Sequence, residues 1–241
     1  MAVNLPRVMG HRGAAGHAPE NTLAAIRTAA RLGVCWVEFD IHLSADGIPV
    51  LLHDDTLDRT TDGEGPVDAH RASDLRDLDA GRWFSSAFAG EPIPTLEDTL
   101  PLLAELGLGA NIEIKPSPGR ELETGYAVAR LVRERWPGVL PPPLLSSFKP
   151  ASLAAAREVA PDFARALLMR GLSNDWARQM RELDCTILHC GHRWLTASDA
   201  ESVRRAGYTL NVFTVNDRAK ADTLYGWGVG TVISDYPDRL L

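Results

Sequence analysis

The segment Trp36-Val37-Glu38-Phe39-Asp40-Ile41 combines the pattern of a buried strand with two acidic residues. Its apolar positions are almost continuous, which is typical of a strand covered on both faces in a parallel sheet. Glu38 and Asp40 have the i, i+2 spacing, so both side chains point to the same side of the strand. Carboxylates inside a sheet are costly unless they are paired or bound to a cation. We therefore expect this strand to carry part of a site.

Seven further runs along the chain have a similar strand-like character. They lie at Arg7–Gly10, Ala110–Ile114, Leu144–Ser147, Ala164–Met169, Thr186–His189, Thr209–Thr214 and Thr231–Ser234. Helical patterns separate them, and those that begin at Thr95 and Ser198 have the spacing of a capping box. Eight alternations of strand and helix predict an α/β fold, a (β/α)8 TIM barrel. We expect one domain over residues 1–241, since barrels of this length form a single core.

The gap between the second and third predicted strands is longer than a barrel needs. It spans roughly 70 residues, against a minimum of roughly a dozen for a parallel crossover. Asp46-Gly47 is a strong turn signal between Ile41-His42-Leu43 and Ile48–Leu52, so the extra segment should begin as a hairpin. We predict a small insertion over about residues 44–93 that belongs to the same domain.

Charge and cysteine content narrow the possible partners and the compartment. The net charge of −7 argues against nucleic acid or an anionic membrane surface, but a bound cation would still allow a small anionic substrate. No apolar run reaches the length of a membrane span. Cys35, Cys185 and Cys190 are an odd number without framework spacing, which indicates reduced thiols and predicts a cytoplasmic protein.

The acidic strand is the centre of a wider group of polar residues. In a TIM barrel, function gathers at the carboxyl ends of the strands. Glu113 and Lys115 repeat the i, i+2 geometry on the third predicted strand. With Glu38 and Asp40, Glu113 makes three acids, and such all-oxygen ligands favour Mg²⁺ or Ca²⁺. The alternative is a buried ion-pair network in which Lys115 neutralises these acids.

Two histidines flank this acidic group in the predicted barrel. His11 and Arg12 follow the first strand, and His53 follows the apolar run Val50–Leu52. Imidazole titrates near neutral pH, so the two histidines are suited to act as a general acid–base pair. A cation, three acids and two proton-transfer groups predict metal-assisted hydrolysis of an anionic ester.

These segments resemble the glycerophosphodiester phosphodiesterase family, and in particular its short cytosolic bacterial members. The resemblance extends over residues 7–238. It rests on segments that match the family in order and spacing, namely His11-Arg12-Gly13, Pro19-Glu20-Asn21-Thr22, Glu38-Phe39-Asp40, His53-Asp54, Asn111–Lys115, Val212–Asn216 and Ile233–Pro237.

The resemblance implies an activity and a role for each matching residue. It implies hydrolysis of a small glycerophosphodiester to glycerol 3-phosphate and an alcohol, with one divalent cation, Mg²⁺ or Ca²⁺. The implied roles are catalysis for His11 and His53, metal ligation for Glu38, Asp40 and Glu113, and phosphate contact for Arg12 and Lys115. Glu20 and Asn21 would brace the loop that carries Arg12.

The residues that select the alcohol are less sharply indicated. Phe213 stands where the family often has Trp, so an aromatic contact with substrate is kept without the indole N–H. Phe148 and Trp227 are further candidates for the wall, with ordinary packing as the alternative, and His189 is a candidate rim contact. The sequence leaves open the leaving alcohol, the metal, the choice between water attack and a cyclic phosphate, and the oligomeric state.

Two other classes of function remain possible at this point. One is a barrel enzyme in which Lys115 forms a Schiff base with a carbonyl substrate. The other is a catalytically silent relative that only binds phosphodiesters. Against the second, a protein that only binds has no need of the proton-transfer pair His11 and His53.

Overall fold

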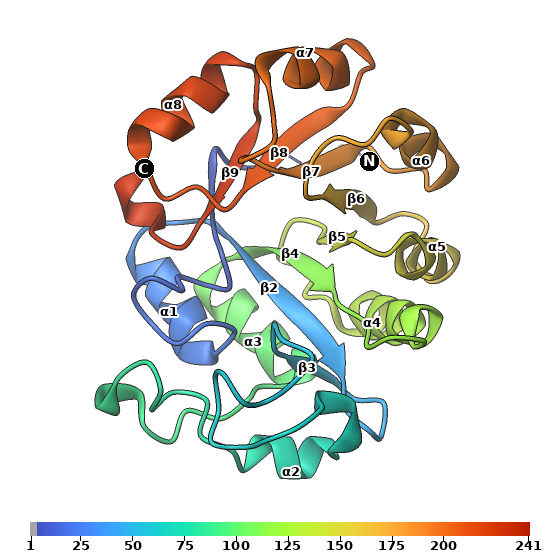
Figure 1. Cartoon of the computed structure of the whole chain (residues 1–241). Helices are drawn as coiled ribbons and strands as arrows, with labels where there is room; N and C mark the ends of the chain where they lie inside the picture. The colour runs from blue at the N-terminus through green and yellow to red at the C-terminus, as the bar shows by residue number, and fades with distance from the viewer. Residues whose placement is uncertain (1–3) are drawn as a thin grey trace.

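The computed structural model describes residues 4–241, so residues 1–3 of the expected domain lie outside the described part. Eight parallel strands form a closed barrel (Figure 1), which confirms the predicted TIM barrel. In the order in which they pair around the barrel, the strands are β1 (Val8–Gly10), β2 (Trp36–Leu43), β4 (Gly109–Ile114), β5 (Leu144–Ser147), β6 (Ala164–Met169), β7 (Ile187–Gly191), β8 (Thr209–Phe213) and β9 (Thr231–Ser234).

The first strand closes the barrel. β1 pairs with β9 through Val8 and Val232, and with β2 through Gly10 and Val37. In Figure 1 the dark blue segment that precedes α1 accordingly lies next to β9. The barrel has no open edge among the described strands, so the carboxyl ends of all eight face one mouth.

Helices surround the barrel, because each must bury one apolar face against the strands. They are α1 (Leu23–Arg31), α3 (Leu96–Leu106), α4 (Glu121–Arg135), α5 (Pro150–Val159), α6 (Trp176–Glu182), α7 (Ala197–Arg205) and α8 (Arg218–Gly226), with a short 3₁₀ turn, η3 (Pro237–Arg239), at the end. Among the described residues, none of the helices is both long and apolar enough to cross a bilayer.

The helix starts follow from local capping, with one correction to the sequence prediction. The side chains of Thr95 and Asp98 form the expected reciprocal capping box at the start of α3. The second box was placed wrongly at Ser198. It is Thr196 that accepts from the Asp199 backbone, so α7 begins two residues earlier than that assignment implied. Thr22 caps α1.

The insertion leaves the barrel at the carboxyl end of β2. As predicted, it begins with a hairpin, in which β3 (Pro49–Leu51) pairs antiparallel with the last residues of β2. It continues through η1 (Val67–Ala69), α2 (Ala72–Arg76) and η2 (Ser86–Phe88), and its apolar side chains form a small cluster separate from the main core. Figure 1 shows this segment beside the barrel mouth, next to β2.

The loop after β1 is held close to its neighbours by backbone contacts. His11 N donates to Ser234 O on β9 at 2.8 Å, and Gly13 N donates to Glu38 O on β2 at 3.0 Å. A Cβ on Gly10 would lie 2.1 Å from Gly13 O, so only glycine allows this approach. The tight loop fixes His11 and Arg12 between the first and last strands.

Candidate active site

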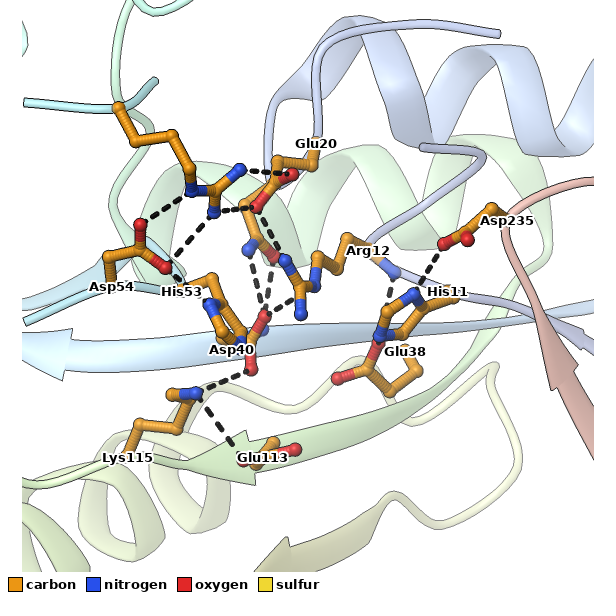
Figure 2. A network of polar contacts seen from close by, with 12 residues as sticks. His11, Arg12, Glu20, Glu38, Asp40, His53, Asp54, Glu113, Lys115 and Asp235 are labelled. Atoms are coloured by element: carbon orange, nitrogen blue, oxygen red, sulfur yellow. Dashed lines mark hydrogen bonds and ion pairs between the residues drawn. The ribbon is translucent and has the colours of Figure 1, made fainter. Parts of the chain in front are cut away.

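A cavity of about 600 Å³ opens at the carboxyl ends of the barrel strands. Seven of the eight predicted site residues line it, namely His11, Arg12, Asp40, His53, Glu113, Lys115 and Phe213. The eighth, Glu38, lies just beneath and lines a small void that it shares with His11 and Glu113. The structure thus brings residues from His11 to Phe213 together at one mouth. Figure 2 shows the polar side chains among them.

The three predicted acidic ligands form a compact buried group. Glu38 and Asp40 project from β2, and Glu113 is the register partner of Asp40 on β4. Each offers a carboxylate oxygen within 4.8 Å of the others. One oxygen of Glu38 and one of Glu113 (Oε1 in each) are buried without a hydrogen bond. Unpartnered buried carboxylate oxygens are costly, so this group is suited to a cation with oxygen ligands.

The ionisation of these acids is unequal. Burial raises the pKa of Glu113 to about 8, and the charge of Asp40 adds to the effect. Burial, together with Asp40 and Glu113, raises the pKa of Glu38 well above its usual range. Burial also opposes ionisation of Asp40, but Arg12 and Lys115 outweigh it and lower the pKa to about 2. Only one charge of the three is therefore balanced by protein cations, which leaves the two glutamates in need of a proton or a metal.

His11 is oriented by a carboxylate from the last strand. Its Nδ1 lies 2.6 Å from Asp235 Oδ1, and its Nε2 lies 3.9 Å from Glu38 Oε2. Asn216 holds Asp235 by donating to its Oδ2 at 2.7 Å and by accepting from its backbone N at 2.9 Å. The hydrogen bond to Asp235 places the proton on Nδ1, so Nε2 is directed toward the acidic group.

His53 has an equivalent arrangement supplied by the insertion. Its Nδ1 lies 2.6 Å from Asp54 Oδ1, and Arg59 Nε donates to Asp54 Oδ2 at 2.5 Å. Burial lowers the pKa of His53, and the charges of Arg12 and Lys115 lower it further. Both predicted catalytic histidines are thus half-buried imidazoles, each fixed by an adjacent carboxylate.

Arg12 and Lys115 place positive charge above the acids. Lys115 Nζ lies 3.7 Å from Asp40 Oδ1 and 3.9 Å from Glu113 Oε1. Arg12 Nη1 donates to Glu20 Oε1 at 2.6 Å, and its backbone N donates to Glu38 Oε2 at 2.9 Å. The buried-network alternative accounts for these pairs, but it leaves Glu38 Oε1 without a partner and gives Glu113 Oε1 only the 3.9 Å contact with Lys115.

The expected loop brace is present. Glu20 accepts from both Arg12 and Arg59, and so joins the loop after β1 to the insertion. Asn21 Nδ2 donates to Asp40 Oδ2 at 2.9 Å, and Asn21 Oδ1 accepts from Asp40 N at 3.0 Å. Asp40 is therefore held from both its backbone and its side chain.

The aromatic wall is partly as expected. Phe213 and Phe148 both line the cavity and meet edge to face, with ring centroids 5.8 Å apart. Trp227 does not line it but ends α8 and packs on the core, so ordinary packing is the correct reading there. His189 is wrong as a rim contact: it is fully buried in the barrel and lies 3.2 Å from Asn211 Nδ2.

Four residues of the polar network, namely Asp54, Arg59, Asn216 and Asp235, had been given no role in the site from the sequence. Asp54 directly follows His53 in the sequence. Asp235 had a usable signal, because it directly follows the last strand. Asn216 likewise follows a predicted strand end. Arg59 carried no signal, since it lies in an irregular loop and reaches the site only through the fold of the insertion.

Comparison with known proteins identifies the family. The model of the glycerophosphoryl diester phosphodiesterase family matches residues 11–239. The chain belongs to this family. Its members are phosphoric diester hydrolases, so the family and enzyme class expected from the sequence are confirmed.

Relatives of similar length support the assignment to the glycerophosphoryl diester phosphodiesterases. The glycerophosphodiester phosphodiesterase of Caldanaerobacter subterraneus subsp. tengcongensis is 34% identical, over 97% of this chain and 96% of its own. A phosphodiesterase of Oleispira antarctica, solved with the product sn-glycerol-3-phosphate, is 40% identical with a TM-score of 0.95, covering 98% of this chain and 95% of the other. The enzyme of Agrobacterium tumefaciens is 29% identical with a TM-score of 0.79, covering 98% and 99%.

Proposed function

We propose that this protein hydrolyses glycerophosphodiesters to glycerol 3-phosphate and an alcohol, with His11 and His53 as the acid–base pair. The observation that carries the proposal is the common cavity. Two histidines, each oriented by its own carboxylate, line a cavity of about 600 Å³ together with Asp40 and Glu113, and Glu38 lies directly beneath it. The Oleispira antarctica relative binds sn-glycerol-3-phosphate as its product, which supports the same product here.

Glu38, Asp40 and Glu113 are the residues that would hold a divalent cation. The Oε1 atoms of the two glutamates, which are buried without a hydrogen bond, fit such an ion, and oxygen ligands favour Mg²⁺ or Ca²⁺. When bound, the cation supplies positive charge to a non-bridging phosphate oxygen. The proton transfers and the other contacts with the phosphate are made by side chains of the protein.

The two histidines divide the proton transfers. With Nδ1 of each ring hydrogen-bonded to Asp235 or Asp54, both rings have Nε2 free to exchange a proton with substrate. One imidazole removes a proton from the attacking water or glycerol hydroxyl. The other protonates the leaving alkoxide, whose unassisted departure would be slow. Two fixed imidazoles in one cavity can carry out both proton transfers, whereas one imidazole would have to serve as base and acid in turn.

Arg12 and Lys115 are placed to bind the phosphate. Both side chains line the cavity beside Asp40, so their charge acts where negative charge builds up in the transition state. The Schiff-base alternative finds no support, since Lys115 is engaged with Asp40 and Glu113 and the family acts on phosphodiesters.

The test is release of glycerol 3-phosphate from glycerophosphoglycerol, -choline and -ethanolamine, with Mg²⁺ or Ca²⁺ present or removed by chelator. We expect His11→Ala and His53→Ala each to abolish turnover, while the melting temperature stays near wild type. His17→Ala is the matched control, because His17 also pairs with a carboxylate, Asp238 at 2.7 Å, but lies outside the cavity. Normal turnover by either site variant would refute the assignment, and full activity after exhaustive chelation would remove the metal from it.

A cytoplasmic location remains part of the proposal. Its support is the cysteine content: Cys35, Cys185 and Cys190 are all free thiols in the described structure. Fractionation of cells that express the tagged protein would test it.

A further inference from the structure

A second hollow opens directly from the catalytic cavity, over the ends of β6, β7 and β8. We call it the rim shelf, and it encloses about 270 Å³. Arg170, Phe213 and Thr214 line both the rim shelf and the catalytic cavity, so the two spaces are continuous. His192, Arg193 and Trp194 line the outer part. A substrate held at the acidic group therefore has room to extend into the shelf.

The rim shelf is positively charged in a protein of net charge −7. Arg170 and Arg193 are exposed, and neither has an ion-pair partner among residues 4–241. Lys149, which lines the adjoining part of the catalytic cavity, is likewise exposed and unpaired within that range. No acidic residue lines the shelf. Most other arginines around the barrel mouth are engaged with carboxylates, as Arg12 and Arg59 are, so these unpaired cations are distinctive.

His192 lies in the same positively charged surroundings, near Lys220 and Arg193. Burial lowers the pKa of His192, and the nearby charges of Lys220 and Arg193 lower it further. Two aromatic residues complete the shelf. Trp194, which is 73% exposed, lies at the outer edge of the shelf, and Phe213 lies at the inner end. The shelf thus offers cations for an anion and flat apolar surface for a ring or carbon chain.

We propose that the rim shelf binds the alcohol half of the substrate and favours alcohols that carry a second negative charge, such as a phosphate monoester. This inference rests on the proposed phosphodiesterase function. The glycerol half has no charge beyond the phosphate that is cleaved, and Arg12 and Lys115 already face that phosphate. A second anionic group can only belong to the alcohol. Cationic alcohols such as choline gain nothing from Arg170 and Arg193.

The test compares two esters that differ by one phosphate, glycerophosphoinositol and glycerophosphoinositol 4-phosphate. We expect kcat/KM to be about fivefold or more higher for the phosphorylated ester at low salt, since exposed ion pairs each contribute up to about fivefold. The preference should shrink as salt rises, because the charges are screened. The Arg170→Gln and Arg193→Gln double variant should bring the ratio close to one, and Arg193→Glu should shift preference toward glycerophosphocholine.

Arg130→Gln is the matched control, since Arg130 is an exposed arginine on α4, outside both cavities, and its variant should keep the wild-type ratio. A wild-type ratio of one or less, or a ratio unchanged in the double variant, would overturn the inference. The inference would also be overturned if the protein cleaved glycerophosphoglycerol but neither of the two inositol esters. If no glycerophosphodiester is cleaved at all, the proposed function itself fails and this inference falls with it.

Discussion

Replacing Asp235 by Asn tests how the structure controls the protonation of His11. Asn216 Oδ1 accepts from the Asp235 backbone and from Ser234 Oγ, so its amide cannot turn, and its Nδ2 must point at residue 235. An Asn at 235 would therefore offer its oxygen to Asn216 and its NH₂ to His11. A donor facing Nδ1 moves the imidazole proton to Nε2, the atom that should exchange protons with substrate.

The expected loss follows from the 2.6 Å contact between His11 Nδ1 and Asp235 Oδ1. A charge-assisted hydrogen bond contributes about 1.5–3 kcal/mol, which equals about 10- to 150-fold in kcat. The wrong tautomer adds to this, and the equivalent change in a Ser-His-Asp triad costs about 10⁴-fold. We expect a fall in kcat of at least about 100-fold, with KM changed little because Asp235 orients His11 rather than holding substrate.

The assay is steady-state hydrolysis of glycerophosphoglycerol, together with a thermal shift on adding Ca²⁺ or Mg²⁺. The shift should persist in Asp235→Asn, since Asp235 is not one of the three acids that we propose to hold the cation. Asp238→Asn is the control, because Asp238 makes a similar contact, 2.7 Å to His17, away from the cavity. A kcat within about threefold of wild type, or a loss as large in the control, would refute the reasoning.

Three further predictions concern stability. Burial raises the pKa of Glu113 to about 8. In the chelated protein, protonation of Glu113 should therefore contribute fully to the free energy of unfolding below about pH 4.5, and this contribution should be lost as pH rises through 8. Glu113→Gln should flatten that loss in thermal melts, and an unchanged pH profile would contradict the assignment. Arg165→Ala should cost about 2–4 kcal/mol in urea unfolding, since it strips a buried guanidinium from Asp184 and from the Phe163 carbonyl. Thr95→Ala should cost about 1 kcal/mol by removing the α3 cap, and a change below about 0.3 kcal/mol would count against it.

Much of the barrel could be predicted because its signals are local. Continuous apolar runs such as Trp36–Ile41 need cover on both faces, which the barrel interior and the outer helices supply, and repeated alternation leaves few topologies. The hairpin at Asp46-Gly47 followed from turn chemistry. The capping box expected at Ser198 was wrong because Thr196 also has the required spacing to Asp199, and only backbone geometry distinguishes the two.

In the site, too, local spacing predicts some features and leaves others to the tertiary structure. The alternate spacing of Glu38 with Asp40 and of Glu113 with Lys115 already determined that each pair shares one side of its strand. The placement of Trp227 and His189 could not be read from type or position, because rim, core and barrel interior all accept an aromatic or imidazole ring after a strand or helix.

The sequence by itself determined the strand that carries Glu38 and Asp40, the order of the barrel strands and which polar side chains follow the strand ends, since each depends on neighbouring residues. Only the tertiary structure decided which carboxylate orients which histidine, how Arg59 joins the insertion to the loop after β1, and where the unpaired Arg170 and Arg193 gather beside the cavity. The pairing of His11 with Asp235 in particular depends on closure of β1 against β9, which places residues 11 and 235 side by side. No local pattern encodes such a distant contact.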